Sequence, residues 1–273
     1  MRTIHAYLVR VLLLAPCLVL LSWLGMPPIA HPATPEETGL KIATEARARD
    51  DGFGNFTASQ TMVLRNKQGQ ESRRQLRVKV LEVSDHGDKS QTVLDDPRDV
   101  QGTALLTHAH KREADDQWLY LPALKRVKRI SSSNRSGSFM GSEFSYEDLS
   151  APEVEKFTYR YLRDEPCGDL TCTVCERFPV DKKESGYSRQ VVWQDKDELR
   201  IWKIEYYDRK DAHLKTLTIG NYTQYLDRYW RADEMTMVNH LTGKSTVLTW
   251  SDYQFRTKLR DRDFSKTGLK RVR

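Results

Sequence analysis

The sequence predicts a mainly β protein of the α+β class, built on antiparallel sheet, and two observations carry this prediction. Residues 187–255 alternate stretches rich in Val, Ile, Thr, Tyr and Trp with short polar turns, which is the signature of successive β-hairpins. The N-terminal half shows the same pattern, with a hairpin at 55–83 and further strands at 90–94, 103–111 and 116–121.

One helix is expected ahead of these strands, over residues 34–50. Thr34 can cap its first turn, Pro35 suits the first helical position, and two glutamates follow where the helix dipole favours negative charge. Its thin apolar stripe consists of Leu40, Ala43 and Ala46 or Arg47. In the hairpin that follows, alternation places on one face Phe56, Ala58, Met62 and Leu64.

Two segments between the halves depart from the strand pattern. Residues 131–150 are rich in Ser and Gly, yet they carry the large apolar side chains of Phe139, Met140, Phe144 and Tyr146. Two interpretations stay open: a loop that packs its own hydrophobic groups, and a functional lid. A short helix is expected at 150–156, with Pro152 in its first turn.

The stretch just before this loop is strongly basic. In an extended segment its charges project to both faces, and a central strand could not bury them. We therefore expect an exposed or edge position for Lys125, Arg126, Lys128 and Arg129. The group is interpreted either as a solvated edge that resists aggregation or as a docking patch for acidic groups of a partner or for anionic lipid heads.

The N-terminus predicts export. Residues 1–30 combine Arg2 and Arg10 with a short apolar run, from Val11 to Leu24, that Pro16 interrupts. The run is shorter than the roughly 20 apolar residues that span a bilayer, so we expect a cleaved signal peptide, with a retained anchor as the alternative. The remaining residues, 31–273, suffice for one large β domain or two small ones.

Composition and motifs argue against several classes of function. The net charge of +6 is a modest excess with acids and bases interspersed, so nucleic-acid binding is not expected. The sequence contains no nucleotide-binding, serine-hydrolase or metalloprotease motif. His108 and His110 share a strand face, but no carboxylate or Cys cluster accompanies them, so we expect a surface pair and no metal site.

Three cysteines lie in the segment DEPCGDLTCTVCERFPV. The spacing of Cys172 and Cys175 matches a redox motif, but that motif opens a helix, whereas this segment has the pattern of a strand. Positions three apart on a strand point to opposite faces. Cys167 and Cys172 instead bracket a turn, so we expect a disulfide between them, in an oxidising compartment, and a buried free thiol at Cys175.

Four stretches together resemble the bacterial outer-membrane lipoprotein-sorting (LolA-like) family, in the branch often encoded beside resistance-nodulation-division transporters. They are YLPALKRVKRI, GSFMGSEFSYEDLS, GYSRQVVWQDKDELRIWKIEYYDRKDAHLKTLTI and YWRADEMTMVNHLTGKSTVLTWSDYQF. The resemblance covers about residues 36–273. It implies a periplasmic protein whose incomplete antiparallel β-barrel has helices over its concave face, with an apolar cavity for acyl chains. It implies no catalytic residue and no cofactor.

An apolar cavity of this kind should be lined by aromatic side chains of the strands. The best candidates are Trp118, Tyr120, Trp193, Trp202, Tyr206 and Trp250. Trp202 and Tyr206 are expected to share a strand face, and the alternative for each aromatic is ordinary core packing. The loop would close over the cavity with Phe139, Met140 and Phe144, and the basic group would sit near the rim.

The expected function is that of a monomeric periplasmic carrier or chaperone, a single domain over residues 31–273, that binds lipidated or lipid cargo for transfer toward the outer membrane. One alternative is an accessory subunit of an inner-membrane transporter that carries no free lipid. Another is a thiol oxidoreductase, which would depend on Cys172 and Cys175.

Overall fold

The computed structural model describes residues 32–272, so the expected signal peptide at 1–30 lies outside the described residues. Thirteen strands form one antiparallel sheet. The strands are β1 (Asn55–Arg65), β2 (Glu71–Leu81), β3 (Lys89–Asp96), β4 (Ala104–His108), β5 (Asp116–Leu121), β6 (Arg126–Ile130), β7 (Phe157–Cys167), β8 (Leu170–Pro179), β9 (Tyr187–Asp195), β10 (Ile201–Asp208), β11 (His213–Tyr225), β12 (Tyr229–Asn239) and β13 (Ser245–Phe255). The predicted mainly β class is confirmed.

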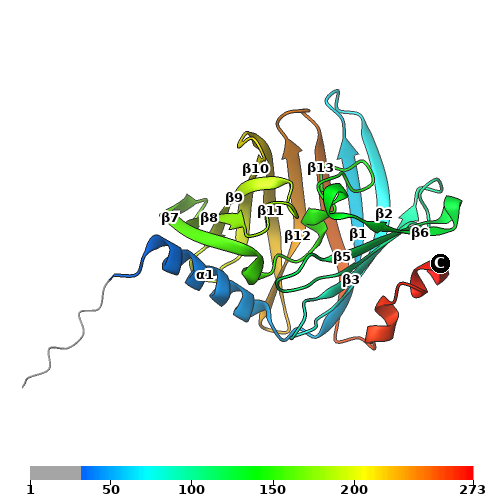
Figure 1. Ribbon diagram of the computed structural model, residues 1–273, viewed down its shortest axis with the longest axis horizontal. Coiled ribbons are helices and arrows are strands. Elements are labelled where there is room, and N and C mark those ends of the chain that lie inside the picture. The colour runs from blue at the N-terminus through cyan, green and yellow to red at the C-terminus, as the bar shows by residue number, and fades with distance from the viewer. Residues whose placement is uncertain (1–31, 273) are drawn as a thin grey trace, which may run out of the picture. The chain divides into compact units, whose positions relative to one another are not determined.

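The order of the strands explains the path of the chain. β1 to β6 form one meander, β7 to β13 form a second, and the pairing of β1 with β13 joins them (Figure 1). β6 and β7 therefore occupy opposite edges of the sheet, although they are consecutive strands in the sequence. The sheet does not close into a barrel, and the segment 131–156 has to cross from one edge to the other.

The main hydrophobic core lies on one face of this sheet, and that face is concave. Leu105 on β4 and Ile204 on β10 belong to the same cluster although many strands separate them, which requires the sheet to curl. The crossing segment contributes Phe139, which is 0% exposed, and Phe144, which is 3% exposed, to this cluster. The loop therefore covers part of the concave face with apolar side chains.

The predicted helix is present as α1 (Pro35–Asp50), the one α-helix among residues 32–272. Thr34 accepts the backbone N–H of Glu37 at 3.1 Å, and the Glu37 carboxylate accepts the N–H of Thr34 at 2.8 Å, which forms a capping box. α1 runs beside β7 (Figure 1). The several helices expected over the concave face are thus replaced by one helix and the crossing segment.

The crossing segment holds only short 3-10 turns. They are η2 (Ser132–Asn134), η3 (Glu147–Leu149) and η4 (Val154–Lys156). The helix expected at 150–156 is reduced to the last of these. A further turn, η1 (Pro122–Leu124), precedes β6.

α1 approaches β7 most closely at Gly39. A Cβ on this residue would lie 2.9 Å from the backbone nitrogen of Tyr161 and 3.0 Å from that of Arg160. Leu40, expected on the apolar stripe, is instead 48% exposed, because Gly39 occupies the position that faces the sheet. A glycine that looks unfavourable in a helix is therefore explained by the backbone contact.

Replacing Gly39 with Val should destabilise the protein. The added atoms meet backbone rather than a movable side chain, so we expect a loss of about 1–3 kcal/mol, as for overpacked cores. The melting temperature should fall by about 2–4 °C for each kcal/mol. Thr44→Val, on the exposed side of α1, is the control and should leave the melting temperature unchanged. Equal melting temperatures for the two variants would contradict the close contact.

The convex face carries two smaller clusters. A C-terminal segment with the turns η5 (Asp261–Phe264) and η6 (Gly268–Arg271) places Phe264 and Leu269 against the outer side of β3 and β4 (Figure 1). This cover was not expected from the sequence. The other cluster surrounds Cys172 and Trp193 on β8 and β9.

Candidate functional site

A cavity of about 990 Å³ lies between α1 and the concave face of the sheet. One wall is the side of α1 that carries Ile42, Ala43 and Ala46. The opposite wall includes Val192 on β9 and Ile219 on β11, which also belong to the main core. The volume is at the upper end of the range of about 300–1,000 Å³ that ligand pockets occupy.

The lining of this cavity is mostly apolar. Residues from the sheet and from the crossing segment complete it, and the apolar and aromatic ones are Phe56, Ala151, Pro152, Val154, Tyr159, Leu199, Ile201, Tyr222, Trp230, Ala232, Met235 and Tyr253. Two of the tyrosine hydroxyls have protein acceptors: that of Tyr159 donates to the carbonyl oxygen of Val154 at 3.2 Å, and that of Tyr222 to the carbonyl oxygen of Ile201 at 2.5 Å. The cavity surface is therefore suited to hydrocarbon.

Charged side chains gather where α1 ends. Arg231 pairs with Asp50 at 2.5 Å, and Arg228 donates to the carbonyl oxygen of Ala48 at 3.1 Å. A cation at the C-terminal end of a helix is favourable because the helix dipole is negative there. Polar contacts therefore attach this end of α1 to the strands.

Arg47, within α1, forms a second set of ion pairs. Arg47 lies 3.0 Å from Asp51 and 3.6 Å from Asp88. Burial raises the pKa of Asp88 and of Glu153, and the positive charge of Arg47 opposes both shifts. α1 is thus fixed by a few ion pairs and by the Gly39 contact, and only a small part of its surface is apolar core.

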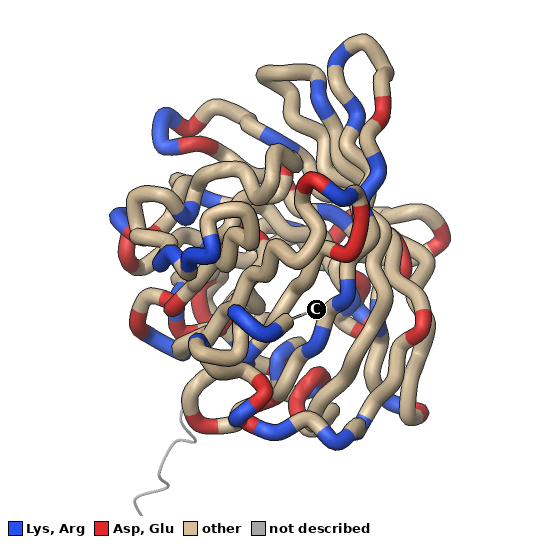
Figure 2. Tube along the Cα trace, turned by 90° about the vertical axis from the view of Figure 1, so that its right-hand side faces the viewer, with Lys and Arg blue, Asp and Glu red and all other residues tan. Residues whose placement is uncertain are grey.

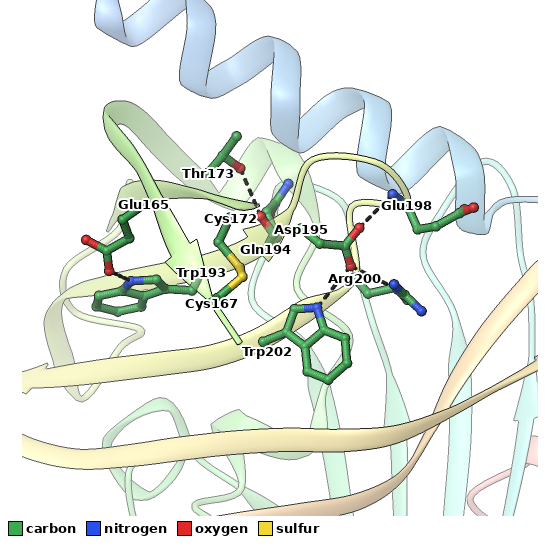
Figure 3. The surroundings of a disulfide bond; sticks show 10 residues. All are labelled: Glu165, Cys167, Cys172, Thr173, Trp193, Gln194, Asp195, Glu198, Arg200 and Trp202. Carbon is green, nitrogen blue, oxygen red and sulfur yellow. Dashed lines mark hydrogen bonds and ion pairs between the residues drawn. A yellow bond between two sulfur atoms is a disulfide. The ribbon is translucent and has the colours of Figure 1, made fainter. Parts of the chain in front are cut away.

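The hairpin of β7 and β8 is closed by a disulfide between Cys167 and Cys172, the bond expected from the sequence (Figure 3). Beside it, Asp195 accepts hydrogen bonds from Trp202 Nε1 at 3.0 Å and from Arg200 Nε at 2.9 Å. Burial acts to raise the pKa of Asp195, but these bonds and the Glu198 N–H lower it. The carboxylate fixes the turn whose residues Glu198, Leu199 and Arg200 line the cavity.

Cys175 is free, buried and part of the cavity lining, whereas Cys172 belongs to the cluster on the convex face. The two sulfur atoms therefore point to opposite faces of β8, as the strand pattern predicts. Burial raises the pKa of the Cys175 thiol to about 11. A redox pair has no structural basis here, because Cys172 is already bonded and Cys175 is not a thiolate at neutral pH.

Cys175 should react slowly with iodoacetamide in the native protein at pH 8. The rate should increase about tenfold per pH unit below the raised pKa, because only the thiolate reacts. Peptide-resolved mass spectrometry of native and urea-unfolded protein measures this. Native Cys175 that reacts as fast as the unfolded form at pH 8 would contradict the burial.

None of the aromatic and lid residues that the sequence analysis selected lines this cavity. Five pack in the main core on the concave face: Tyr206, Trp250, Phe139, Met140 and Phe144. Two pack in the cluster near the disulfide: Trp193 and Trp202. Two pack beneath the C-terminal segment: Trp118 and Tyr120.

Trp202 and Tyr206 do not share a face of β10, contrary to the expectation from the sequence. Regular alternation would place both on one face, but the register of β10 against β9 shifts between Ile201 and Lys203. This bulge places Trp202 against the cluster of Cys172 and Trp193, with its ring 5.2 Å from that of Tyr222, while Ile201 lines the cavity. Sequence alternation alone does not reveal a bulge.

The basic patch, Lys125, Arg126, Lys128 and Arg129, is exposed and belongs to β6 and the turn before it. The predicted edge position is confirmed, because β6 ends the sheet. Arg129 pairs with Asp116 at 2.5 Å. In the described part of the chain the other three have no ion pair, and none of the four lines the cavity. Figure 2 shows basic and acidic positions interspersed over this side.

The two histidines take separate partners. His108 Nε2 lies 2.7 Å from the carbonyl oxygen of Phe264, and His110 Nε2 lies 3.2 Å from an Asp116 oxygen. Within residues 32–272 no group of three or more His, Cys, Asp or Glu side chains is arranged to hold a metal ion. In the same range no helix has the length and apolar character needed to cross a membrane.

Among the polar residues of the cavity that were not predicted from the sequence, two lie on neighbouring strands. Arg177 and Gln194 line it from β8 and β9. A signal existed for the first, because Cys175 was expected to be buried and Arg177 follows it by two positions on the same strand, and therefore on the same face.

Comparisons with known proteins agree with this fold. A family model described as "uncharacterized protein" matches residues 86–271. A crystal structure from Vibrio parahaemolyticus, described as an outer membrane lipoprotein-sorting protein domain, is 57% identical, covers 86% of this chain and 99% of its own, and has a TM-score of 0.84. A DUF1329 family protein from Desulfovibrio piger is 30% identical over 87% of this chain and 100% of its own, with a TM-score of 0.82.

A more distant structure supports the fold alone. It is a LolA superfamily protein from Nitrosomonas europaea, 21% identical over 86% of this chain and 99% of its own, with a TM-score of 0.67. No curated protein sequence matches this chain. Because the Vibrio parahaemolyticus structure is 57% identical and almost completely covered, the chain belongs to the same family, the outer-membrane lipoprotein-sorting proteins.

Proposed function

We propose that this protein holds the acyl chains of a lipidated or lipid cargo in the cavity between α1 and the concave face, and transfers that cargo toward the outer membrane. Membership of the lipoprotein-sorting family supports a lipid or lipoprotein carrier in general. The observation that carries the specific proposal is the cavity of about 990 Å³ with an apolar lining and a single helix as its outer wall.

Burial of an acyl chain in this cavity is energetically favourable. Removing an acyl chain from water contributes about 0.8 kcal/mol for each buried CH₂ group. The same cargo has to leave, so one wall has to move. α1 suits that role, because it contacts chiefly the edge strand β7 and is attached by ion pairs and by Arg228.

The proposal extends to compartment and partners. The protein would act in the periplasm as a monomer, a single domain over residues 31–273, once residues 1–30 are removed. The Cys167–Cys172 disulfide supports an oxidising compartment. The basic patch on β6 would meet anionic lipid heads or an inner-membrane transporter. No catalytic residue, cofactor, metal or nucleic acid has a part in this function.

Titration of the wild-type protein with a fluorescent long-chain fatty acid tests the proposal. We expect saturable binding that an unlabelled lipid displaces. A protein that binds no acyl probe, and with which no lipid co-purifies, would refute the carrier proposal. The transporter-accessory function would then take its place, because the exposed basic patch would still offer a docking surface.

A further inference from the structure

Arg177 is a cation without an anionic partner inside the cavity. It lies on β8 between Tyr159 of β7 and Gln190 of β9. Its Nε donates to the Gln190 side-chain oxygen at 2.8 Å, and its guanidinium carbon lies 4.8 Å from the centre of the Phe157 ring. Within residues 32–272 no carboxylate forms an ion pair with it, and its two terminal nitrogens make no hydrogen bond.

The nearby carboxylates are engaged elsewhere. Asp148 pairs with Lys215 at 2.6 Å, and Glu147 accepts the backbone N–H of Gly186 at 2.9 Å. Burial lowers the pKa of Arg177, and the negative charges of Asp148 and Glu147 oppose that shift only from a distance. A desolvated, unpaired cation costs free energy, so its presence requires either a structural or a binding explanation.

A second donor in the same cavity also lacks an acceptor. Gln194 is 6% exposed, and its Nε2 is buried with no hydrogen-bond partner in the described part of the protein. Gln194 follows Gln190 and Val192 on the same face of β9. The concave side of β8 and β9 thus offers two donor groups without protein acceptors, next to the apolar lining of the cavity.

We propose that the cargo site selects an amphiphile with a terminal oxyanion, and that Arg177 binds this group inside the cavity while the hydrocarbon chain lies against α1 and β11. A guanidinium matches a carboxylate or phosphate through two parallel N–H donors. The apolar lining from Ile42, Ala43 and Ile219 supplies the surface for the chain. This inference rests on the proposed carrier function and names the chemical class of its ligand.

The test compares three ligands with the same alkyl chain: a fatty acid, an alkyl phosphate and a fatty alcohol. Each displaces a fluorescent acyl probe from the wild type, from Arg177→Met and from the control Arg163→Met. Arg163 is exposed on β7 and lies outside the cavity lining. We expect the wild type and the control to bind an acid at least about tenfold more tightly than the alcohol, as a charge-assisted hydrogen bond implies.

In Arg177→Met the preference for the acid should vanish, while the affinity for the alcohol stays unchanged and shows that the variant is folded. The ratio of the fatty acid to the alkyl phosphate identifies which oxyanion is preferred. Equal binding of acid and alcohol by the wild type would overturn this inference and leave the carrier function intact. Failure of all three ligands to bind would refute the carrier function itself.

Discussion

Replacing Ala43 with Trp should abolish most acyl binding. Ala43 faces the cavity from α1, so the indole enters space that we assign to the hydrocarbon chain rather than a packed core. We expect the dissociation constant of a fluorescent fatty acid to rise by at least about tenfold, which is 1.4 kcal/mol. Fluorescence titration of the folded variant measures the effect.

The control for this substitution is the next residue in the helix. Thr44 is exposed and lies outside the cavity lining, so Thr44→Trp adds the same side chain to the solvent side of α1. Its affinity for the acyl probe should match that of the wild type. If both variants bind as the wild type does, the acyl chain does not occupy this cavity.

The second large effect concerns stability. Phe139 is fully buried, its ring lies 5.7 Å from that of Tyr146, and its N–H donates to the carbonyl oxygen of Phe144 at 2.8 Å. Phe139→Ala should cost about 3–5 kcal/mol, as deletions of buried aromatic rings do. Thermal unfolding should show a melting temperature lower by about 10 °C, because each kcal/mol corresponds to about 2–4 °C at this chain length.

Leu124→Ala provides the comparison. Leu124 is 62% exposed beside β6, and the change should alter stability by less than about 0.5 kcal/mol. A Phe139 variant as stable as this control would show that the crossing segment does not pack on the concave core. Phe139→Ala is expected to lower the stability of the fold and not to alter the ligand site, because this side chain belongs to the core and does not line the cavity.

Local sequence patterns were sufficient for most of the strands and for α1. Period-two alternation and turn residues mark β1 and β2, and the register of these two strands pairs Asn55 with Leu81 and Arg65 with Glu71. The cap at Thr34 marks the start of α1. The same alternation places Cys172 and Cys175 on opposite faces of β8, because that statement needs only the local strand geometry.

The location of the cavity depends on long-range structure. Alternation groups side chains on a face, but the pairing of β1 with β13 and the curl of the sheet decide which face is concave. Large aromatics are as suitable for core as for a ligand site, and Tyr206 and Trp250 are in the core. Small residues of α1, such as Ala43 and Ala46, leave the space that forms the cavity.

The packing of the C-terminal segment could not be predicted from the sequence, for a different reason. The last residues are strongly charged, and that composition hides the apolar contacts of Phe264 and Leu269. Trp118 and Tyr120 pack with these two residues, on the face of β5 opposite Leu119, and therefore lie outside any cavity on the concave face. A short apolar motif within a charged segment gives no periodicity from which such packing could be predicted.

The most direct test of the central claim is native mass spectrometry of protein purified without detergent, followed by organic extraction. We predict that the wild type and Thr44→Trp carry an additional mass that is extracted as an acyl lipid, and that Ala43→Trp carries much less of it. A wild-type protein with no bound lipid, or equal lipid on Ala43→Trp and the wild type, would contradict the assignment of the α1 cavity as the cargo site.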